Sequence, residues 1–310
     1  YSYEYAFYKS SYFAVCHPKE GSLSKRSIYV GGYFWNDEGK TFIYRKARRE
    51  EMIPKKIHYC WFGGNPLPEL AIKCIESWKK FCPDYEIIEW NESNFDINCC
   101  DYVREAYQAK KWAFVSDYAR FKILYENGGL YFDTDVEMIK PFDDIILMGG
   151  FMGCERDMDV SVAPGLGLAV SPGSELYREL LEMYHTLRFI NEDGTLNLNT
   201  VVDYTTGILL KHGLKNTKEI QQIAGINIYP KEYFCPMDYY TGELTITTNT
   251  YSIHHYTASW YSETEKFAYQ LKRKYIKFLP RKMAGILATS IAKIKYEGLI
   301  SWMKWVLKKR

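Results

Sequence analysis

The sequence lacks the features of a membrane-spanning or secreted chain. Its 310 residues contain no run of 18 apolar residues and no secretory signal peptide. Eight cysteines are present, but none forms a Cys-x-x-Cys pair, and the vicinal Cys99 and Cys100 cannot easily bond to each other. We therefore expect reduced thiols and a cytoplasmic protein.

A phosphate-binding glycine loop of full spacing is also missing. Gly149, Gly150 and Gly153 stand close together, as do Gly165 and Gly167, but neither group lies in a strand-loop-helix context with the required spacing. We interpret both groups as turns. The apolar fraction of 47% is sufficient for a full core, and the length suits one large domain or one domain with attachments.

Acidic residues are almost absent from the C-terminal end. Residues 266–310 contain 13 Lys or Arg and one acid, Glu297, whereas the rest of the chain has 27 basic and 37 acidic residues, a net charge of −10. The acidic body argues against a nucleic-acid-binding protein. From Tyr296 onwards apolar residues recur at helical spacing, flanked by Trp302 and Trp305. This basic amphipathic helix predicts contact with an anionic membrane surface, so we expect a peripheral protein on the inner face of the cell membrane. A packed helix with a solvated basic face is the alternative, and nucleic acid is a weaker one.

Strands and helices alternate through the middle of the chain. We predict, in order, a strand at 57–62, a helix at 70–81, a strand at 86–90, a helix at 101–110 and a strand at 130–132. Strands at 151–154 and 165–170 and helices at 176–187 and 201–212 follow. The alternation predicts an α/β fold with a mainly parallel sheet flanked by helices. In such sheets ligands bind outside the carboxyl ends of the strands.

The two ends of the chain differ from this body. Residues 27–34 and 40–46 read as two strands of a hairpin around Asn36–Gly39. Met52 stands directly before the first core strand. We therefore expect the main domain at 52–262, an extension of unassigned role at 1–51 and a basic helical tail at 263–310.

The stretch from Ser116 to Glu137 carries the strongest chemical signal. A helix ends at Asn127-Gly-Gly, a short apolar strand follows, and the strand runs into Asp133 and Asp135. With a period of two, both carboxylates point the same way, and a hard cation such as Mg²⁺ or Mn²⁺ makes their proximity tolerable. Two solvated loop aspartates are the alternative reading, because the same spacing recurs in 157–159 without that context.

Two further runs support a site. Asp117 and Arg120 are three residues apart, so they share a face of the helix. Later, residues 251–260 read Tyr-Ser-Ile-His-His-Tyr-Thr-Ala-Ser-Trp. Adjacent histidines face opposite sides of a strand, so at most one of His254 and His255 can serve a metal. A structural histidine is the ordinary reading of either.

Taken together, residues 57–64, 116–135 and 254–260 resemble glycosyltransferase family 32, the bacterial and fungal sugar transferases with an Asp-x-Asp motif. The catalytic domains of the large clostridial glucosylating toxins are more distantly similar. The resemblance implies a GT-A fold over 52–262, a UDP- or GDP-sugar donor, Mn²⁺ or Mg²⁺ as cofactor, and retention of anomeric configuration.

The resemblance also assigns roles to particular residues. Catalytic roles fall to Asp117, Arg120, Asp133 and Asp135. Donor contacts fall to Trp61, Asp117, Arg120, Tyr131, Asp133, Ser259 and Trp260. The metal ligands would be Asp133, Asp135 and His255, with His254 as the reserve for the third position.

The expected function is transfer of a sugar to a glycan or lipid-linked acceptor in capsule, exopolysaccharide or lipopolysaccharide synthesis. A nucleotidyltransferase that makes nucleotide sugars, a sugar-binding protein without catalysis, and an effector that glycosylates a host protein are the alternatives. The nucleotidyltransferase should carry a basic glycine-rich loop after its first strand, where this chain has Trp61-Phe-Gly-Gly-Asn.

Overall fold

A computed structural model describes residues 52–156, 159–257 and 262–308, together with the backbone of 3–8, 11–16, 33–35 and 41–43. The chain divides into two compact units, Tyr1–Met52 and Ile53–Arg310. The predicted boundary between the main domain and the tail at 262 stays a prediction.

The first unit contains two antiparallel strand pairs. β1 (Tyr3–Tyr8) pairs with β2 (Ser11–Cys16), and β3 (Tyr33–Trp35) pairs with β4 (Thr41–Ile43). The second pair is the predicted hairpin, with Trp35 opposite Thr41. The outer parts of its two predicted strands lie outside the described residues.

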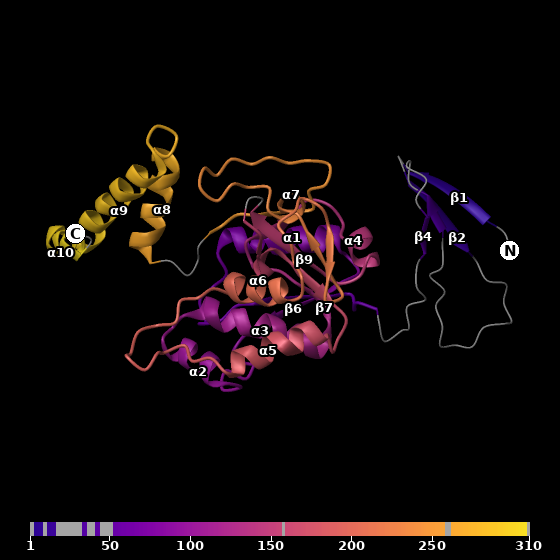
Figure 1. Cartoon of the computed structure of the whole chain (residues 1–310), viewed down its shortest axis with the longest axis horizontal. Coiled ribbons are helices and arrows are strands. Elements are labelled where there is room, and N and C mark those ends of the chain that lie inside the picture. The colour runs from indigo at the N-terminus through magenta and orange to yellow at the C-terminus, as the bar shows by residue number, and fades with distance from the viewer. Residues whose placement is uncertain are drawn as a thin grey trace. The chain divides into compact units, whose positions relative to one another are not determined.

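The second unit is built on an eight-stranded sheet (Figure 1). Its strands are β5 (Lys56–Cys60), β6 (Glu86–Trp90), β7 (Gly129–Tyr131), β9 (Phe151–Arg156), β10 (Ser161–Val162), β11 (Leu168–Val170), β12 (Gln221–Ile223) and β13 (Ile226–Tyr229). The spatial order is β12-β13-β9-β11-β7-β5-β6, and β10 pairs with β9. β5, β6, β7, β9 and β13 run in one direction, and β10, β11 and β12 run in the other. The predicted α/β class with a mainly parallel sheet is confirmed.

Helices cover both faces of this sheet. They are α1 (Glu69–Phe81), α2 (Asp101–Gln108), α3 (Trp112–Asn127), α4 (Asp143–Leu147), α5 (Glu175–His185), α6 (Val201–Lys211) and α7 (Lys231–Phe234), with a 3₁₀ turn, η2, at Pro164–Leu166. The helix predicted at 101–110 ends at Gln108, because Lys110 has a positive φ of 56°. The strand predicted at 165–170 begins at Leu168, because η2 occupies the preceding residues.

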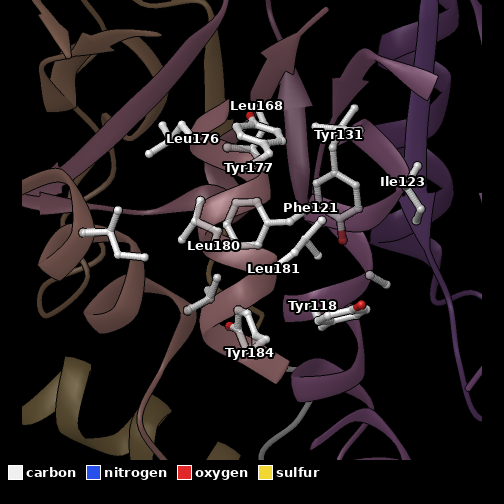
Figure 2. Close-up of a cluster of buried hydrophobic side chains, with 14 of the residues drawn as sticks. Tyr118, Phe121, Ile123, Tyr131, Leu168, Leu176, Tyr177, Leu180, Leu181 and Tyr184 are labelled. Atoms are coloured by element: carbon white, nitrogen blue, oxygen red, sulfur yellow. The ribbon is translucent and has the colours of Figure 1, made fainter. Parts of the chain in front are cut away.

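Alternation along the strands divides the core into two layers. On β7, Leu130 packs with α1 and α4, whereas Tyr131 packs with α2, α3 and α5. Figure 2 shows the second layer, in which Phe121 of α3 and Tyr177 of α5 meet near Leu168 of β11. Since successive residues alternate, Asp133 lies on the Tyr131 side of the sheet, facing α3. The sheet therefore brings the first aspartate of the motif towards Asp117 and Arg120.

A small second sheet completes the edge where the aspartates lie. β8 (Val136–Met138) pairs antiparallel with β14 (Ser252–His254), and Val136 lies opposite His254. The pairing joins segments more than 100 residues apart in the chain. It places the late histidine run beside the Asp-x-Asp motif.

The C-terminal segment of the described chain is helical, as predicted. It contains α8 (Glu263–Tyr275), α9 (Arg281–Glu297) and α10 (Leu299–Lys308). The helix expected to run from Tyr296 is instead broken at Gly298, whose φ is +84°. Within the described residues, none of the helices has the length and hydropathy that crossing a bilayer requires.

His58, at the centre of β5, is fully buried and held as a neutral ring. Trp90 Nε1 donates to His58 Nδ1 at 3.0 Å, and His58 Nε2 donates to the Gly128 carbonyl at 3.0 Å. Burial lowers the pKa of His58 to about 4, against 6.5 for an exposed histidine. The ring therefore joins β5, β6 and the glycine that ends α3, and it does so without a charge.

We predict that protonation of His58 makes the fold acid-sensitive. Below pH 6.5 the unfolded chain takes up a proton at this ring, whereas the folded chain resists protonation until about pH 4. The free energy of unfolding should therefore fall by up to about 3 kcal/mol between pH 7 and pH 4. Urea denaturation across this range should show the loss in the wild type but not in His58→Gln. If the free energy of unfolding changes equally with pH in the two proteins, the prediction is contradicted.

Candidate active site

A buried guanidinium forms the centre of the candidate site. Arg120, on α3, is 3% exposed. Its Nη2 lies 2.9 Å from Asp117 Oδ1 and 3.4 Å from Asp133 Oδ1, and its Nε donates to the Ser116 carbonyl at 3.0 Å. The Tyr131 ring centroid lies 5.0 Å from Arg120 Cζ, and the Tyr131 hydroxyl donates to Asp133 Oδ1 at 3.1 Å. The sheet and α3 thus bring together four of the predicted residues.

One nitrogen of this guanidinium is left unpaired. Among the described residues, none accepts a hydrogen bond from Arg120 Nη1, although the atom is buried. The nearby Gly165 has no side chain, and a Cβ there would lie 3.5 Å from Nη1 and 2.1 Å from Asp133 Oδ2. A buried charged donor without a partner is costly, so it marks a position where a ligand oxygen can bind.

Asp117 is unusual because it is buried next to both a cation and an anion. Burial raises its pKa to about 7, and the carboxylate of Asp133 adds to the rise. Arg120 and the backbone N–H of Val201, at the start of α6, act in the opposite direction. Asp117 can therefore either accept or donate a hydrogen bond near neutral pH.

A tight turn after β14 encloses Asp135. His254 Nε2 lies 3.1 Å from Asp135 Oδ1, and Thr257 donates from both its backbone N–H and its hydroxyl to Oδ2, each at 2.9 Å. Burial favours the neutral acid, but His254 and Thr257 outweigh it and lower the pKa of Asp135 well below its usual range. Asp135 is therefore an anion with a defined orientation.

Asp133, Asp135 and His254 can supply ligands for one metal ion. One ligand atom from each of the three lies within 4.8 Å of the others. Two carboxylate oxygens with an imidazole suit Mn²⁺, and carboxylates also suit Mg²⁺. The set is incomplete for either ion, which leaves positions for the oxygens of a bound phosphate. The residues present therefore fit a divalent cation.

His255 does not share this cluster, contrary to the preference for it as third ligand. Its Nε2 lies 2.8 Å from Glu137 Oε2, and Lys73 pairs with the same carboxylate at 3.1 Å. Because adjacent residues of a strand face opposite sides, only one of the two histidines can reach Asp135. The register of β14 against β8 puts His254 there.

Other predicted residues are placed less directly. Trp61 follows β5 at the same edge of the sheet, where its Nε1 donates to the Asn65 carbonyl at 2.6 Å. Ser259 and Trp260 lie outside the described residues, and their predicted donor contacts stay predictions.

Sequence reasoning did not single out Gly165 or Thr257. In the sequence Gly165 has the same appearance as its neighbour Gly167, and both are predicted as turn residues. The Gly165 carbonyl accepts a bond from the Asp133 N–H at 3.1 Å, and its missing side chain leaves space for that carboxylate. Thr257 lies within the histidine run, which was the available signal, but only the fold brings it to Asp135.

Comparisons with known proteins find similarity over the part of the chain that contains the Asp-x-Asp motif. Residues 68–149, which include Asp133 and Asp135, match the family model described as "Glycosyltransferase sugar-binding region containing DXD motif". "Subversion of eukaryotic traffic protein A" of Legionella pneumophila is 30% identical over 152 residues, which is 40% of this chain and 23% of that protein. "Inositol phosphoceramide mannosyltransferase 3" of Schizosaccharomyces pombe is 33% identical over 104 residues, 32% of this chain and 29% of that protein.

The chain therefore spans less than a third of the length of these two curated relatives. Among solved structures, "PaToxG Glycosyltransferase" is similar with a TM-score of 0.43 and 20% identity, over 52% of this chain and 70% of that one. Residues 68–149 of this chain are thus similar to the DXD-containing sugar-binding region of glycosyltransferases, which agrees with the resemblance to glycosyltransferase family 32.

Proposed function

We propose that this chain is a metal-dependent, retaining glycosyltransferase that uses a nucleotide-sugar donor. The observation that carries the proposal is the cluster of Asp133, Asp135 and His254 next to the buried Arg120. Sugar transfer releases a nucleoside diphosphate, and the developing negative charge needs fixed positive groups near it. A divalent cation held by the cluster would supply most of that positive charge.

The chain's own residues divide the remaining work. Arg120 Nη1 would donate to a diphosphate or sugar oxygen, because it is buried without another acceptor among the described residues. Asp117 would bind a sugar hydroxyl and keep the guanidinium in place. The bond from the sugar to the diphosphate would break as the acceptor oxygen bonds to the same face of the sugar, and the proton of the acceptor hydroxyl would pass to the departing diphosphate oxygen. Trp61 would stack on the base, and Ser259 and Trp260 would close over the diphosphate, as in the family that the chain resembles.

The structure gives little support to a nucleotidyltransferase. The loop after β5, residues 61–68, has no Lys or Arg where a triphosphate-binding loop needs positive charge. Glu92 Oε1 accepts a bond from the Gly63 N–H at 2.7 Å and so occupies a backbone donor of that loop. The indole of Trp112 lies directly against Gly63, at 2.6 Å from its ideal Cβ position.

We further propose a lipid-linked acceptor at an anionic membrane surface. The fungal relative is named as a mannosyltransferase of inositol phosphoceramide, which favours a lipid acceptor and a mannose donor. The Legionella relative is named for the subversion of eukaryotic traffic, which favours an effector that acts inside a host cell. A role in capsule, exopolysaccharide or lipopolysaccharide synthesis stays a prediction. GDP-mannose is the first donor to test.

The surface of α9 and α10 supports the membrane part of this proposal. Half of the large apolar side chains that are exposed in the described chain lie between residues 278 and 307. On α10, Leu299, Ile300, Met303 and Leu307 share one face and are 49–72% exposed. The Lys and Arg residues of the same segment would contact anionic headgroups while these side chains enter the bilayer.

Asp135→Asn should reduce hydrolysis of the nucleotide-sugar donor by about 100-fold or more, because a metal ligand and its charge are weakened. Release of nucleoside diphosphate with and without Mn²⁺ measures the effect. Asp159→Asn is the matched control, since it removes an exposed carboxylate of the second, equally spaced pair. Normal turnover in Asp135→Asn would refute the assignment of the site.

Gly165→Ala should weaken Mn²⁺ binding by about tenfold, because the new methyl group must displace the Asp133 carboxylate. Isothermal titration calorimetry, with Mn²⁺ added to the metal-free protein, measures the affinity for Mn²⁺. Gly165 has no positive φ, so the substitution adds bulk without straining the backbone. Gly207→Ala is the control, because a Cβ in that position of α6 meets nothing within 4 Å. An unchanged affinity in Gly165→Ala would show that Asp133 does not bind the metal.

The double substitution Ile300→Ser and Leu307→Ser should release the protein from anionic liposomes without changing donor hydrolysis. It removes apolar area from the exposed face of α10 and leaves every charge in place. Co-sedimentation with vesicles that contain phosphatidylserine measures binding. Leu198→Ser with Leu210→Ser removes similarly exposed leucines from the main body and should leave binding unchanged. If both double variants sediment like the wild type, α10 does not insert.

A further inference from the structure

Helix α8, at the start of the basic C-terminal segment, forms side-chain hydrogen bonds to a loop of the main body. Tyr269 donates its hydroxyl to the Tyr239 carbonyl at 2.9 Å, and Arg273 Nε donates to the same oxygen at 3.1 Å. Arg273 Nη2 also reaches the Asp238 carbonyl at 3.4 Å. Tyr269 and Arg273 are one helical turn apart, and the guanidinium lies 4.7 Å from the Tyr269 ring. One backbone carbonyl is thus held by two side chains of α8.

Tyr239, whose carbonyl accepts these hydrogen bonds, is connected to the candidate metal ligands through packed side chains. The Tyr239 ring packs edge-on against Tyr256, with 5.1 Å between centroids. Tyr256 in turn lies 4.3 Å from the His254 ring, and its hydroxyl is 2.8 Å from Cys235 Sγ. A continuous series of contacts therefore runs from α8 through two tyrosines to His254.

Tyr256 itself has a backbone conformation that needs external support. Its φ is +54°, in the left-handed region that side chains such as tyrosine rarely adopt. On one side His255 N–H donates to the Asp135 carbonyl at 3.0 Å, and on the other Thr257 bonds to the Asp135 carboxylate. The strained residue is thus the middle of the turn that encloses Asp135. If its ring lost its packing, the turn could relax and move both neighbours.

We propose that Tyr269 and Arg273 are positioning residues of the metal site, acting through Tyr239. They hold the Tyr239 ring against Tyr256, and this contact keeps the turn around Asp135 closed with His254 aimed at the cluster. Helix α8 then supports the donor site, whereas the exposed faces of α9 and α10 would contact the membrane surface proposed above. The inference rests on the proposed metal-dependent function.

The affinity for Mn²⁺ tests this role directly. In the metal-free 310-residue chain, electron paramagnetic resonance of free Mn²⁺ measures the dissociation constant without any turnover. Arg273→Met keeps the aliphatic stem but removes the donors, and should raise the dissociation constant about tenfold, as expected when outer partners of metal ligands are lost. Tyr269→Phe removes one hydroxyl and should act in the same direction. Lys274→Met is the control, because it removes an equal charge from the exposed side of α8.

A second readout separates positioning from general destabilisation. In donor hydrolysis, Arg273→Met should need about tenfold more Mn²⁺ for half-maximal rate but recover its kcat at saturating metal. Dissociation constants within twofold of the wild type in both Arg273→Met and Tyr269→Phe would overturn the proposal, as would an equal effect in Lys274→Met. A wild-type chain that binds no Mn²⁺ would overturn the proposed metal site and this inference with it, whereas wild-type binding with unchanged variants would overturn the inference alone.

Discussion

The burial of one arginine imposes the arrangement of the candidate site. Arg120 is almost inaccessible to water and cannot give up its proton, so its charge has to be balanced by neighbours inside the protein. Asp117 and Asp133 provide that balance from a helix and from the end of a strand. Because two carboxylates share one guanidinium, neither is fully neutralised. The excess negative charge of the two carboxylates favours a cation, and the unpaired Nη1 favours an oxygen acceptor. The site therefore suits a ligand that carries both.

The other half of the site depends on a long-range strand pairing. β8 follows the Asp-x-Asp motif, and β14 precedes the turn around Asp135. Their pairing therefore positions the motif and the turn relative to each other. A shift of one residue in this register would turn His254 away from Asp135 and bring His255 to that side of the strand. The metal-binding potential of the chain is therefore a property of this short sheet as much as of the aspartates.

The C-terminal segment combines two kinds of surface. Helix α8 begins with a capping box between Ser262 and Glu265 and directs Tyr269 and Arg273 towards the main body. Helix α9 packs through small buried alanines at 284, 288 and 292, which leaves its larger apolar residues exposed. The same C-terminal segment therefore carries both hydrogen bonds to the main body and an exposed apolar surface.

The sequence by itself determined the α/β class, the order of the main strands and helices between residues 57 and 212, and the position of Asp133 and Asp135 as a paired motif after a capped helix and an apolar strand. These are local signals, because periodicity, glycine stops and the spacing of charges are properties of neighbouring residues. Only the tertiary structure decided that His254 and not His255 reaches Asp135, that Gly165 leaves room for the Asp133 carboxylate, and that Thr257 holds Asp135. Each of those contacts joins residues more than 30 positions apart, and strand register and packing set such contacts, not local spacing.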